Sequence, residues 1–226
     1  MRKRFRTFLL PLVGAALAFS PLAKADTVFT SFGAGQSYAP PGNGTPIHGA
    51  DAMAVPAGYR AEAMAFTPTA NYTLSQVDIA LQYGGLGSNL VNLALAVDNG
   101  SGLPGTVLET WNGVVPSTTG TGVETVTPTS TISLSDGTQY WLEALPGASD
   151  TTAIWNSSST LGNAAVDMGS GFVARNTPPV GYQIGAFDVL GDAIQTNAPA
   201  PEPSSVALAL GGFTVLAGLL RRRRKA

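Results

Sequence analysis

The sequence predicts an all-β domain, an antiparallel β-sandwich or jelly roll, that lies between two targeting segments. Turn-forming residues such as Gly, Pro, Asn and Asp recur roughly every 8–12 residues, which is the spacing of short antiparallel strands. The stretches between these turns alternate apolar and polar residues or are rich in Thr and Val. Residues 26–192 contain no apolar pattern of a long amphipathic helix, so strands joined by turns are the expected elements.

The chain begins with the three parts of a secretory signal peptide. Basic residues at positions 2–6 precede an apolar run over residues 8–19. Ala23 and Ala25 then supply the small residues of an A-x-A cleavage site. We expect cleavage after Ala25, so residues 1–25 are excluded from the fold.

The most regular predicted strand spans residues 72–83. Its odd-numbered side chains from Val77 to Tyr83 are apolar and define a buried face, whereas Asp78 belongs to the opposite face. Residues 33–58 are rich in Gly and Pro and are expected to be a loop. The other strands are expected at residues 26–32, 59–66, 90–97, 107–115, 122–127, 131–134, 138–145, 152–155, 164–168, 171–174 and 182–190.

The basic residues are concentrated at the two ends of the chain. Between residues 26 and 200 only Arg60 and Arg175 are basic, against 13 acidic residues, so this segment has a net charge of −11. This balance argues against nucleic-acid binding, which needs a basic surface. The chain has no cysteine, which excludes disulfides, thiolate catalysis and cysteine-bound metal. Stability must therefore come from the core.

The sequence contains no assembled catalytic set, so a hydrolase is the least expected function. His48 is the only histidine, and we expect it in a solvated loop rather than in a catalytic triad or a zinc site. The acidic residues offer no way to choose the carboxylate pair of a glycosidase. Asp98, in Asp-Asn-Gly-Ser-Gly, and Asp136, in Ser-Asp-Gly, are the candidate calcium ligands. Ordinary turns are the expected structure at both, so no cofactor is expected.

Three tryptophans, Trp111, Trp141 and Trp155, are candidate glycan contacts. An exposed aromatic ring can stack on a sugar, whereas a ring on a strand is more often part of the core. Trp141 follows Tyr140 directly, so we expect the two rings on opposite faces of a strand, one in the core and the other nearer the surface. A module that binds exopolysaccharide through surface aromatics is thus an alternative to a structural protein.

The last 26 residues have three parts in a fixed order. A short motif of Pro201, Glu202 and Pro203 precedes an apolar run over residues 205–220. As a helix this run is about 24 Å long, at the short limit for a transmembrane helix across a hydrocarbon core of about 30 Å. The final basic residues stop translocation and favour the cytoplasmic side. They are Arg221, Arg222, Arg223, Arg224 and Lys225.

This tail resembles the PEP-CTERM sorting signal of Gram-negative bacteria, in which a PEP motif, a hydrophobic helix and an Arg-rich end occur at the C-terminus. The resemblance implies an exported protein that is held in the membrane, faces the periplasm or cell exterior, and is processed by an exosortase. It also implies release to the extracellular matrix and an association with exopolysaccharide. The expected organisation is a signal peptide (1–25), a β-sandwich (26–192), a Pro- and Ala-rich linker (193–200) and the sorting signal (201–226).

Four short motifs lie along the exported domain. They are Tyr-Thr-Leu-Ser at 72–75, Asp98 with Gly-Leu-Pro-Gly at 102–105, Gly-Thr-Gln-Tyr-Trp-Leu at 137–142, and Trp155 with Asn156. In these residues the domain resembles the choice-of-anchor R family of exported bacterial domains. The resemblance spans residues 72–187 and implies a β-sandwich at the cell surface without an established chemistry. The leading expectation is therefore a non-enzymatic structural protein of the surface or matrix.

Overall fold

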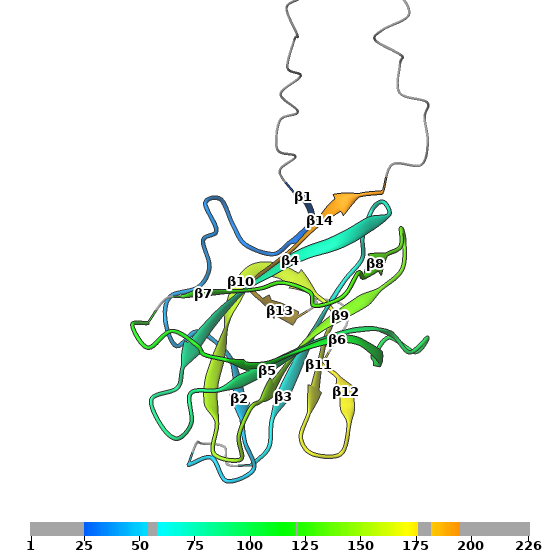
Figure 1. Ribbon diagram of the computed structural model, residues 1–226. Helices are drawn as coiled ribbons and strands as arrows, with labels where there is room; N and C mark the ends of the chain where they lie inside the picture. The colour runs from blue at the N-terminus through cyan, green and yellow to red at the C-terminus, as the bar shows by residue number, and fades with distance from the viewer. Residues whose placement is uncertain (1–24, 54–57, 121, 176–181, 195–226) are drawn as a thin grey trace, which may run out of the picture.

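The computed structural model describes residues 25–53, 58–120, 122–175 and 182–194. These residues form an eight-stranded and a six-stranded antiparallel sheet and contain no helix (Figure 1). The expectation of an all-β domain is therefore confirmed. One hydrophobic core cluster contains side chains from both sheets, so the sheets pack against each other face to face.

The eight-stranded sheet contains the first and the last strand of the domain. Its strands are β1 (Asp26–Thr30), β2 (Gly44–His48), β4 (Tyr72–Tyr83), β7 (Val123–Val126), β8 (Ser133–Leu134), β10 (Thr152–Gly162), β13 (Tyr182–Gly185) and β14 (Phe187–Ala193). Their order is β1-β14-β4-β10-β13; in addition, β2 pairs with β10, and β7 and β8 pair with β4.

The six-stranded sheet has the order β12-β11-β3-β9-β5-β6, so β6 and β12 are its edges. Its strands are β3 (Ala61–Phe66), β5 (Val91–Asp98), β6 (Pro104–Val114), β9 (Tyr140–Pro146), β11 (Ala164–Asp167) and β12 (Phe172–Ala174).

Strand β4 has the buried face that its sequence predicts, with one addition. Val77 and Ile79 are fully buried, whereas Tyr83 is only half-buried. Leu74 also belongs to the core, although its even number predicts the other face. The register against β14 shifts between Leu190 and Gly191, which leaves one extra residue in β4. This bulge turns Leu74 to the core side.

Strand β2 lies inside the segment 33–58 that the sequence predicts to be a loop, so that prediction is wrong. Pro46 argues against a strand there because it cannot donate a backbone hydrogen bond. β2 nevertheless pairs with β10, with Pro46 opposite Ile154. Its other side makes only a single bridge, between His48 and Arg60, so the missing donor is tolerated near the margin of the sheet.

The expected last strand, residues 182–190, is two strands. Ala186 separates β13 from β14, and its backbone N–H donates to the carbonyl of Asn156 at 2.8 Å. β13 pairs with β10, whereas β14 pairs with β1 and β4. The break reverses the alternation, so Ile184 and Phe187 both face the core. β10 also continues to Gly162, well beyond its expected end, through a run of Ser and Thr residues.

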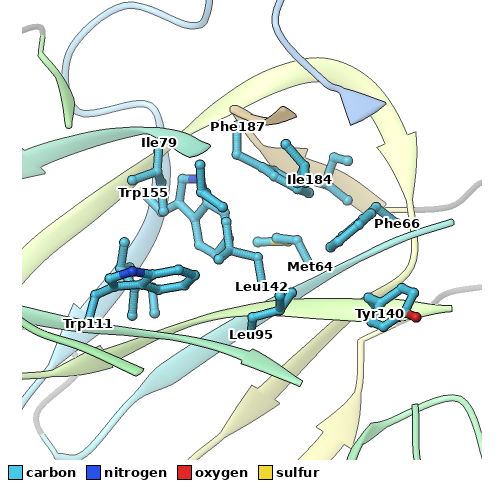
Figure 2. Close-up of a cluster of buried hydrophobic side chains, with 14 of the residues drawn as sticks. Met64, Phe66, Ile79, Leu95, Trp111, Tyr140, Leu142, Trp155, Ile184 and Phe187 are labelled. Atoms are coloured by element: carbon cyan, nitrogen blue, oxygen red, sulfur yellow. The ribbon is translucent and has the colours of Figure 1, made fainter. Parts of the chain in front are cut away.

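The core between the sheets is built around a cluster of aromatic rings (Figure 2). Phe187 of β14 contacts Phe29, Phe66 and Trp155 at centroid distances of 5.0, 6.1 and 5.7 Å, respectively. Phe66 in turn stacks on Tyr140 of β9 at 5.7 Å. The contacts join strands from both sheets, so this cluster fixes how the two layers pack.

The two ends of the domain lie side by side, because β1 pairs with β14 at the edge of the eight-stranded sheet (Figure 1). Asp26 is opposite Gly191 in this pair. The last described residue, Ile194, is held by a backbone hydrogen bond to the carbonyl of Asn71 at 2.9 Å. The terminal segments of the chain therefore join the domain at the same place.

Candidate functional site

The three tryptophans are buried, so they do not form the exposed platform proposed as a glycan contact. Trp141 and Trp155 are 0% exposed and Trp111 is 7% exposed. A sugar needs an accessible ring face for stacking, and these rings are covered by the protein. Each indole N–H also donates within the chain: Trp111 to the carbonyl of Thr127 (2.7 Å), Trp141 to Asp98 Oδ2 (2.9 Å) and Trp155 to the carbonyl of Ala186 (3.1 Å).

Tyr140 and Trp141 lie on opposite faces of β9, but both are buried, which corrects the expectation that one is near the surface. Tyr140 belongs to the core between the sheets, whereas Trp141 packs on the outer face of the six-stranded sheet. Leu103 and Phe172 pack against the same outer cluster. A second, smaller apolar layer therefore covers Trp141.

Asp98 organises a loop and has no oxygen left over for a cation. Its Oδ1 accepts from the backbone N–H groups of Gly100 (2.7 Å) and Gly102 (3.3 Å). Its Oδ2 accepts from Gln139 Nε2 and Trp141 Nε1, both at 2.9 Å. The Trp141 bond is the main cause that lowers the pKa of Asp98. The carboxylate ties the β5–β6 loop to strand β9.

The same loop occurs a second time in the domain, where the sequence-based predictions include no site. Residues 167–171 repeat the D-x-G-S-G pattern of residues 98–102. Asp167 Oδ1 accepts from the N–H groups of Gly169, Ser170 and Gly171 at 2.7–3.0 Å. In both loops the two glycines have positive φ, a conformation that glycine adopts without strain. Leu103 and Phe172, which directly follow the two loops, both pack on the Trp141 cluster.

The structure places Asp136 in an exposed turn, where its backbone N–H donates to Asn71 Oδ1 at 2.9 Å. Within the described ranges, no group of three or more His, Asp or Glu side chains is close enough to hold a metal ion. Asp98 and Asp136, the candidate calcium ligands, are thus not brought together with other carboxylates.

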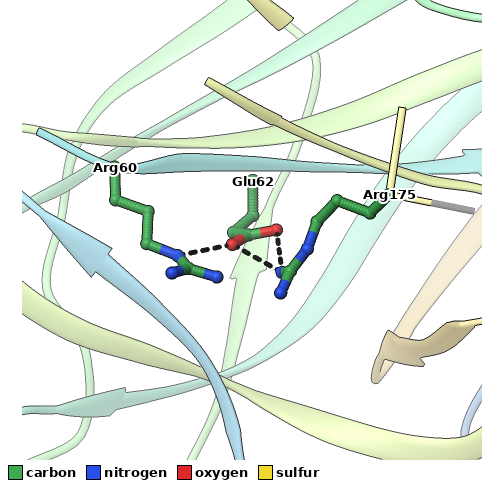
Figure 3. A network of polar contacts seen from close by, with 3 residues as sticks. All are labelled: Arg60, Glu62 and Arg175. Carbon is green, nitrogen blue, oxygen red and sulfur yellow. Dashed lines mark hydrogen bonds and ion pairs between the residues drawn. The ribbon is translucent and has the colours of Figure 1, made fainter. Parts of the chain in front are cut away.

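The two arginines of the domain converge on one buried carboxylate, Glu62 (Figure 3). Arg60 Nε donates to Glu62 Oε1, and Arg175 Nη1 donates to both carboxylate oxygens, all at 2.8 Å. Burial raises the pKa of Glu62, and the arginines oppose this by stabilising its charged form. The Arg175 guanidinium also lies 4.3 Å from the ring centroid of Tyr182. This cluster links β3 and the end of β12 to the start of β13.

The buried carboxylates do not form an exposed catalytic pair. Asp78 and Asp188 are opposite each other on β4 and β14, and both are at least nine-tenths buried. Asp78 accepts from Gln76 and Thr125. Burial is the main cause that raises the pKa of Asp188, with a smaller contribution from Asp78. Both carboxylates are therefore buried inside the fold and are not presented together at an exposed cleft.

His48 is also part of the framework, contrary to the expectation of a solvated loop. It is the last residue of β2 and is 7% exposed. Its backbone N–H and carbonyl pair with those of Arg60 at 2.9 and 2.8 Å. This backbone pair joins the end of β2 to the residue that precedes β3.

One surface cleft of about 550 Å³ lies between β10, β13 and the segment that joins β1 to β2. We call it the serine cleft. The described residues of its lining include no carboxylate or amine; they have small, hydroxyl and amide side chains and one tyrosine ring. Its lining includes the polar side chains of Ser37, Tyr38, Asn43, Ser157, Ser159 and Gln183.

A second cleft of about 550 Å³ lies between β6 and β7, which we call the threonine cleft. It contains Glu124, whose pKa is raised by burial. Two of its hydroxyls are already bonded to acids: Thr125 Oγ1 donates to Asp78 and Thr129 Oγ1 donates to Glu109. Its principal lining residues are Trp111, Asn112, Glu124, Thr125, Thr127 and Thr129.

The sorting residues lie outside the described residues, so the structure gives no geometry for them. This holds for Ala23, for the motif at 201–203, for the apolar run at 205–220 and for the basic block at 221–225. Ala25 is the first residue that the structure describes. Among the described residues there is no helix with the length and apolar character needed to cross a membrane.

No model of a known protein family matches the chain, and no curated protein matches it.

Proposed function

We propose that the chain is an exported, non-enzymatic structural protein of the cell surface or extracellular matrix, sorted by its PEP-CTERM tail. The observation that carries the proposal is the ordered tail, in which Pro201, Glu202 and Pro203 precede an apolar run and a terminal basic block. The signal peptide at residues 1–25 supplies export. The folded part is then a β-sandwich of the exported type, similar to the choice-of-anchor R domains.

In this proposal, the domain is held in the membrane by the apolar run until an exosortase-type enzyme processes the tail. The neighbouring positions of β1 and β14 support this arrangement, because both targeting segments join one end of the domain. The opposite end of the domain then points away from the membrane. After processing, the protein is released to the extracellular matrix.

A structural role is also supported by how the ionisable side chains are used. The carboxylates of Asp98 and Asp167 hold loops, Glu62 holds both arginines, and Glu109 accepts from Thr129 and Ser130. A hydrolase needs a carboxylate or a nucleophile that is held in position but still free to react with a substrate. These groups instead connect strands and loops.

The proposal is tested by the intact mass of the protein recovered from cell membranes and from the medium. We expect the native chain to lose residues 1–25 and its C-terminal apolar segment. A Pro201→Ala, Glu202→Ala, Pro203→Ala triple variant should lose only residues 1–25 and stay in the membrane. The matched control is Pro199→Ala, which removes a proline just before the motif and should be processed normally. Equal processing of the triple variant and the native chain would overturn the sorting proposal.

A further inference from the structure

We propose that the serine cleft is a binding site for a neutral saccharide. The domain has a net charge of −11, yet none of the described residues that line this cleft is charged. A cleft of about 550 Å³ lies within the range of about 300–1,000 Å³ that is usual for small-molecule sites. An uncharged, hydroxyl- and amide-rich lining matches a ligand that is itself uncharged and rich in hydroxyls. This inference does not depend on how the protein is sorted.

The polar side chains of the cleft have hydrogen-bonding capacity to spare. The side chains of Ser37, Asn43 and Gln183 are exposed and make no hydrogen bond to another described residue. The hydroxyl of Ser159 is in the same state. An amide presents both donors and an acceptor, and a hydroxyl presents one donor and two lone pairs. Sugar hydroxyls both donate and accept, so this set suits them.

Tyr38 adds the apolar surface that a sugar ring needs. It is half-buried and lines the cleft, and its ring lies 5.7 Å from the ring of Phe32. Phe32 in turn packs with Ala80 and Ala186 on the outer side of the eight-stranded sheet. The tyrosine ring is therefore held in position before any ligand arrives, which reduces the entropy lost on binding.

The walls of the cleft are fixed by backbone hydrogen bonds. The N–H of Ala39 donates to the carbonyl of Ser157, and the N–H of Ser157 donates to the carbonyl of Asn43, both at 2.9 Å. A tight turn between Gly33 and Ser37 precedes them, with Gln36 at φ 56°, a rare conformation for a non-glycine residue. Strained residues of this kind concentrate at ligand sites.

Strand β10 contributes the opposite wall through an irregular stretch. Its register against β13 is interrupted between Ser157 and Leu161, and Ser158 Oγ accepts from the N–H of Thr160 at 3.0 Å. Bulges redirect side chains and are common beside binding sites. Here the irregularity leaves Ser159 exposed at the cleft.

The threonine cleft has a similar volume but lacks these properties. It contains the carboxylate of Glu124, its aromatic residue Trp111 is only 7% exposed, and two of its hydroxyls are bonded to acids. It therefore serves as an internal control for the chemistry of the serine cleft.

The test measures binding by isothermal titration calorimetry on the full-length protein in mild detergent. The probes are maltotriose, cellotriose, mannotriose and galactotriose, with trigalacturonate as a charged comparison. We expect saturable binding of at least one neutral trisaccharide and weaker or no binding of trigalacturonate. Tyr38→Ala should weaken binding at least about tenfold, whereas Tyr38→Phe, which keeps the ring, should stay within about threefold. Gln183→Ala should weaken binding about three- to tenfold by removing hydrogen bonds.

Asn112→Ala, in the threonine cleft, is the matched control and should leave the affinity unchanged. Thermal unfolding of each variant checks the fold. If Tyr38→Ala is destabilised, the affinity of Gln183→Ala, a substitution at an exposed position, decides whether the proposal stands. The proposal is overturned if no neutral trisaccharide binds at ligand concentrations up to about 20 mM, because a Kd above this value is too weak for a built site. It is also overturned if Asn112→Ala abolishes binding, or if Gln183→Ala leaves it unchanged.

Discussion

Glu143 on β9 is a buried carboxylate, and both arginines of the described part of the chain are bound to Glu62 instead. It is 5% exposed and faces Ala63 and Ala94 on the neighbouring strands. Burial raises its pKa from 4.5 to about 7. The folded state therefore binds this proton more tightly than the unfolded chain, and the free energy of unfolding falls as the pH rises from 4.5 to 7.

We expect wild-type protein to lose roughly 2–3 kcal/mol of stability across this pH window through Glu143. Glu143→Gln should remove most of this slope and be more stable than wild type at pH 8. Glu109→Gln is the control: hydrogen bonds from Thr129 lower the pKa of Glu109, so its loss should destabilise the protein at neutral pH and leave the slope in place. Urea unfolding from pH 4.5 to 8 measures both. An unchanged slope in Glu143→Gln would show that the carboxyl is solvated.

At the scale of the strands, the sequence predicts the elements whose position and buried face follow from the local alternation of apolar residues. The alternation of Val77 and Ile79 gives β4 its place and buried face, because a side chain on every second residue must face the core. Strand β2 could not be predicted in this way, because Pro46 indicates a loop and the segment becomes a strand through its pairing with β10. Nor could the end of β10, because its Ser and Thr residues carry no apolar period.

The candidate sites depend on contacts between distant parts of the chain, which is why the sequence does not reveal them. The burial of Trp141 requires Leu103 and Phe172, which reach it from two separate loops. The serine cleft joins residues near 40, near 158 and at 183. Neither grouping has a spacing that could be recognised, although the repeated D-x-G-S-G pattern is visible in the sequence and marks the two loops.

The two D-x-G-S-G loops give a prediction at this scale, because they have the same backbone role but different side-chain partners. Asp98 also accepts from the buried indole of Trp141, whereas Asp167 accepts from backbone N–H groups of its own loop. Asp98→Ala leaves the indole N–H unpaired, so it should cost about 1–2 kcal/mol more than Asp167→Ala. Urea unfolding followed by tryptophan fluorescence measures the difference. Equal losses would mean that the bond to Trp141 contributes little.

At the scale of the whole molecule, the charges are divided between the two targeting segments, which are basic, and the folded domain, which is acidic. The positive charges lie almost entirely in the terminal segments, and the two that remain in the domain both pair with the single carboxylate of Glu62. The folded part is left with excess negative charge and few internal ion pairs. Such a domain repels its own copies, and it is held together by its three apolar clusters rather than by charge.

This charge distribution predicts how salt and calcium act on the full-length protein at neutral pH. Raising NaCl from 10 to 300 mM should stabilise the fold by about 1 kcal/mol, because salt screens repulsion between acidic side chains. Adding 1 mM CaCl2 in 150 mM NaCl should have no further effect, since Asp98 is already saturated by four N–H donors. A site with a Kd of about 10 µM would instead add about 2.7 kcal/mol under these conditions. Thermal unfolding with and without EDTA distinguishes the two cases. A calcium-dependent rise that Asp98→Asn or Asp136→Asn abolishes would restore these residues as metal ligands.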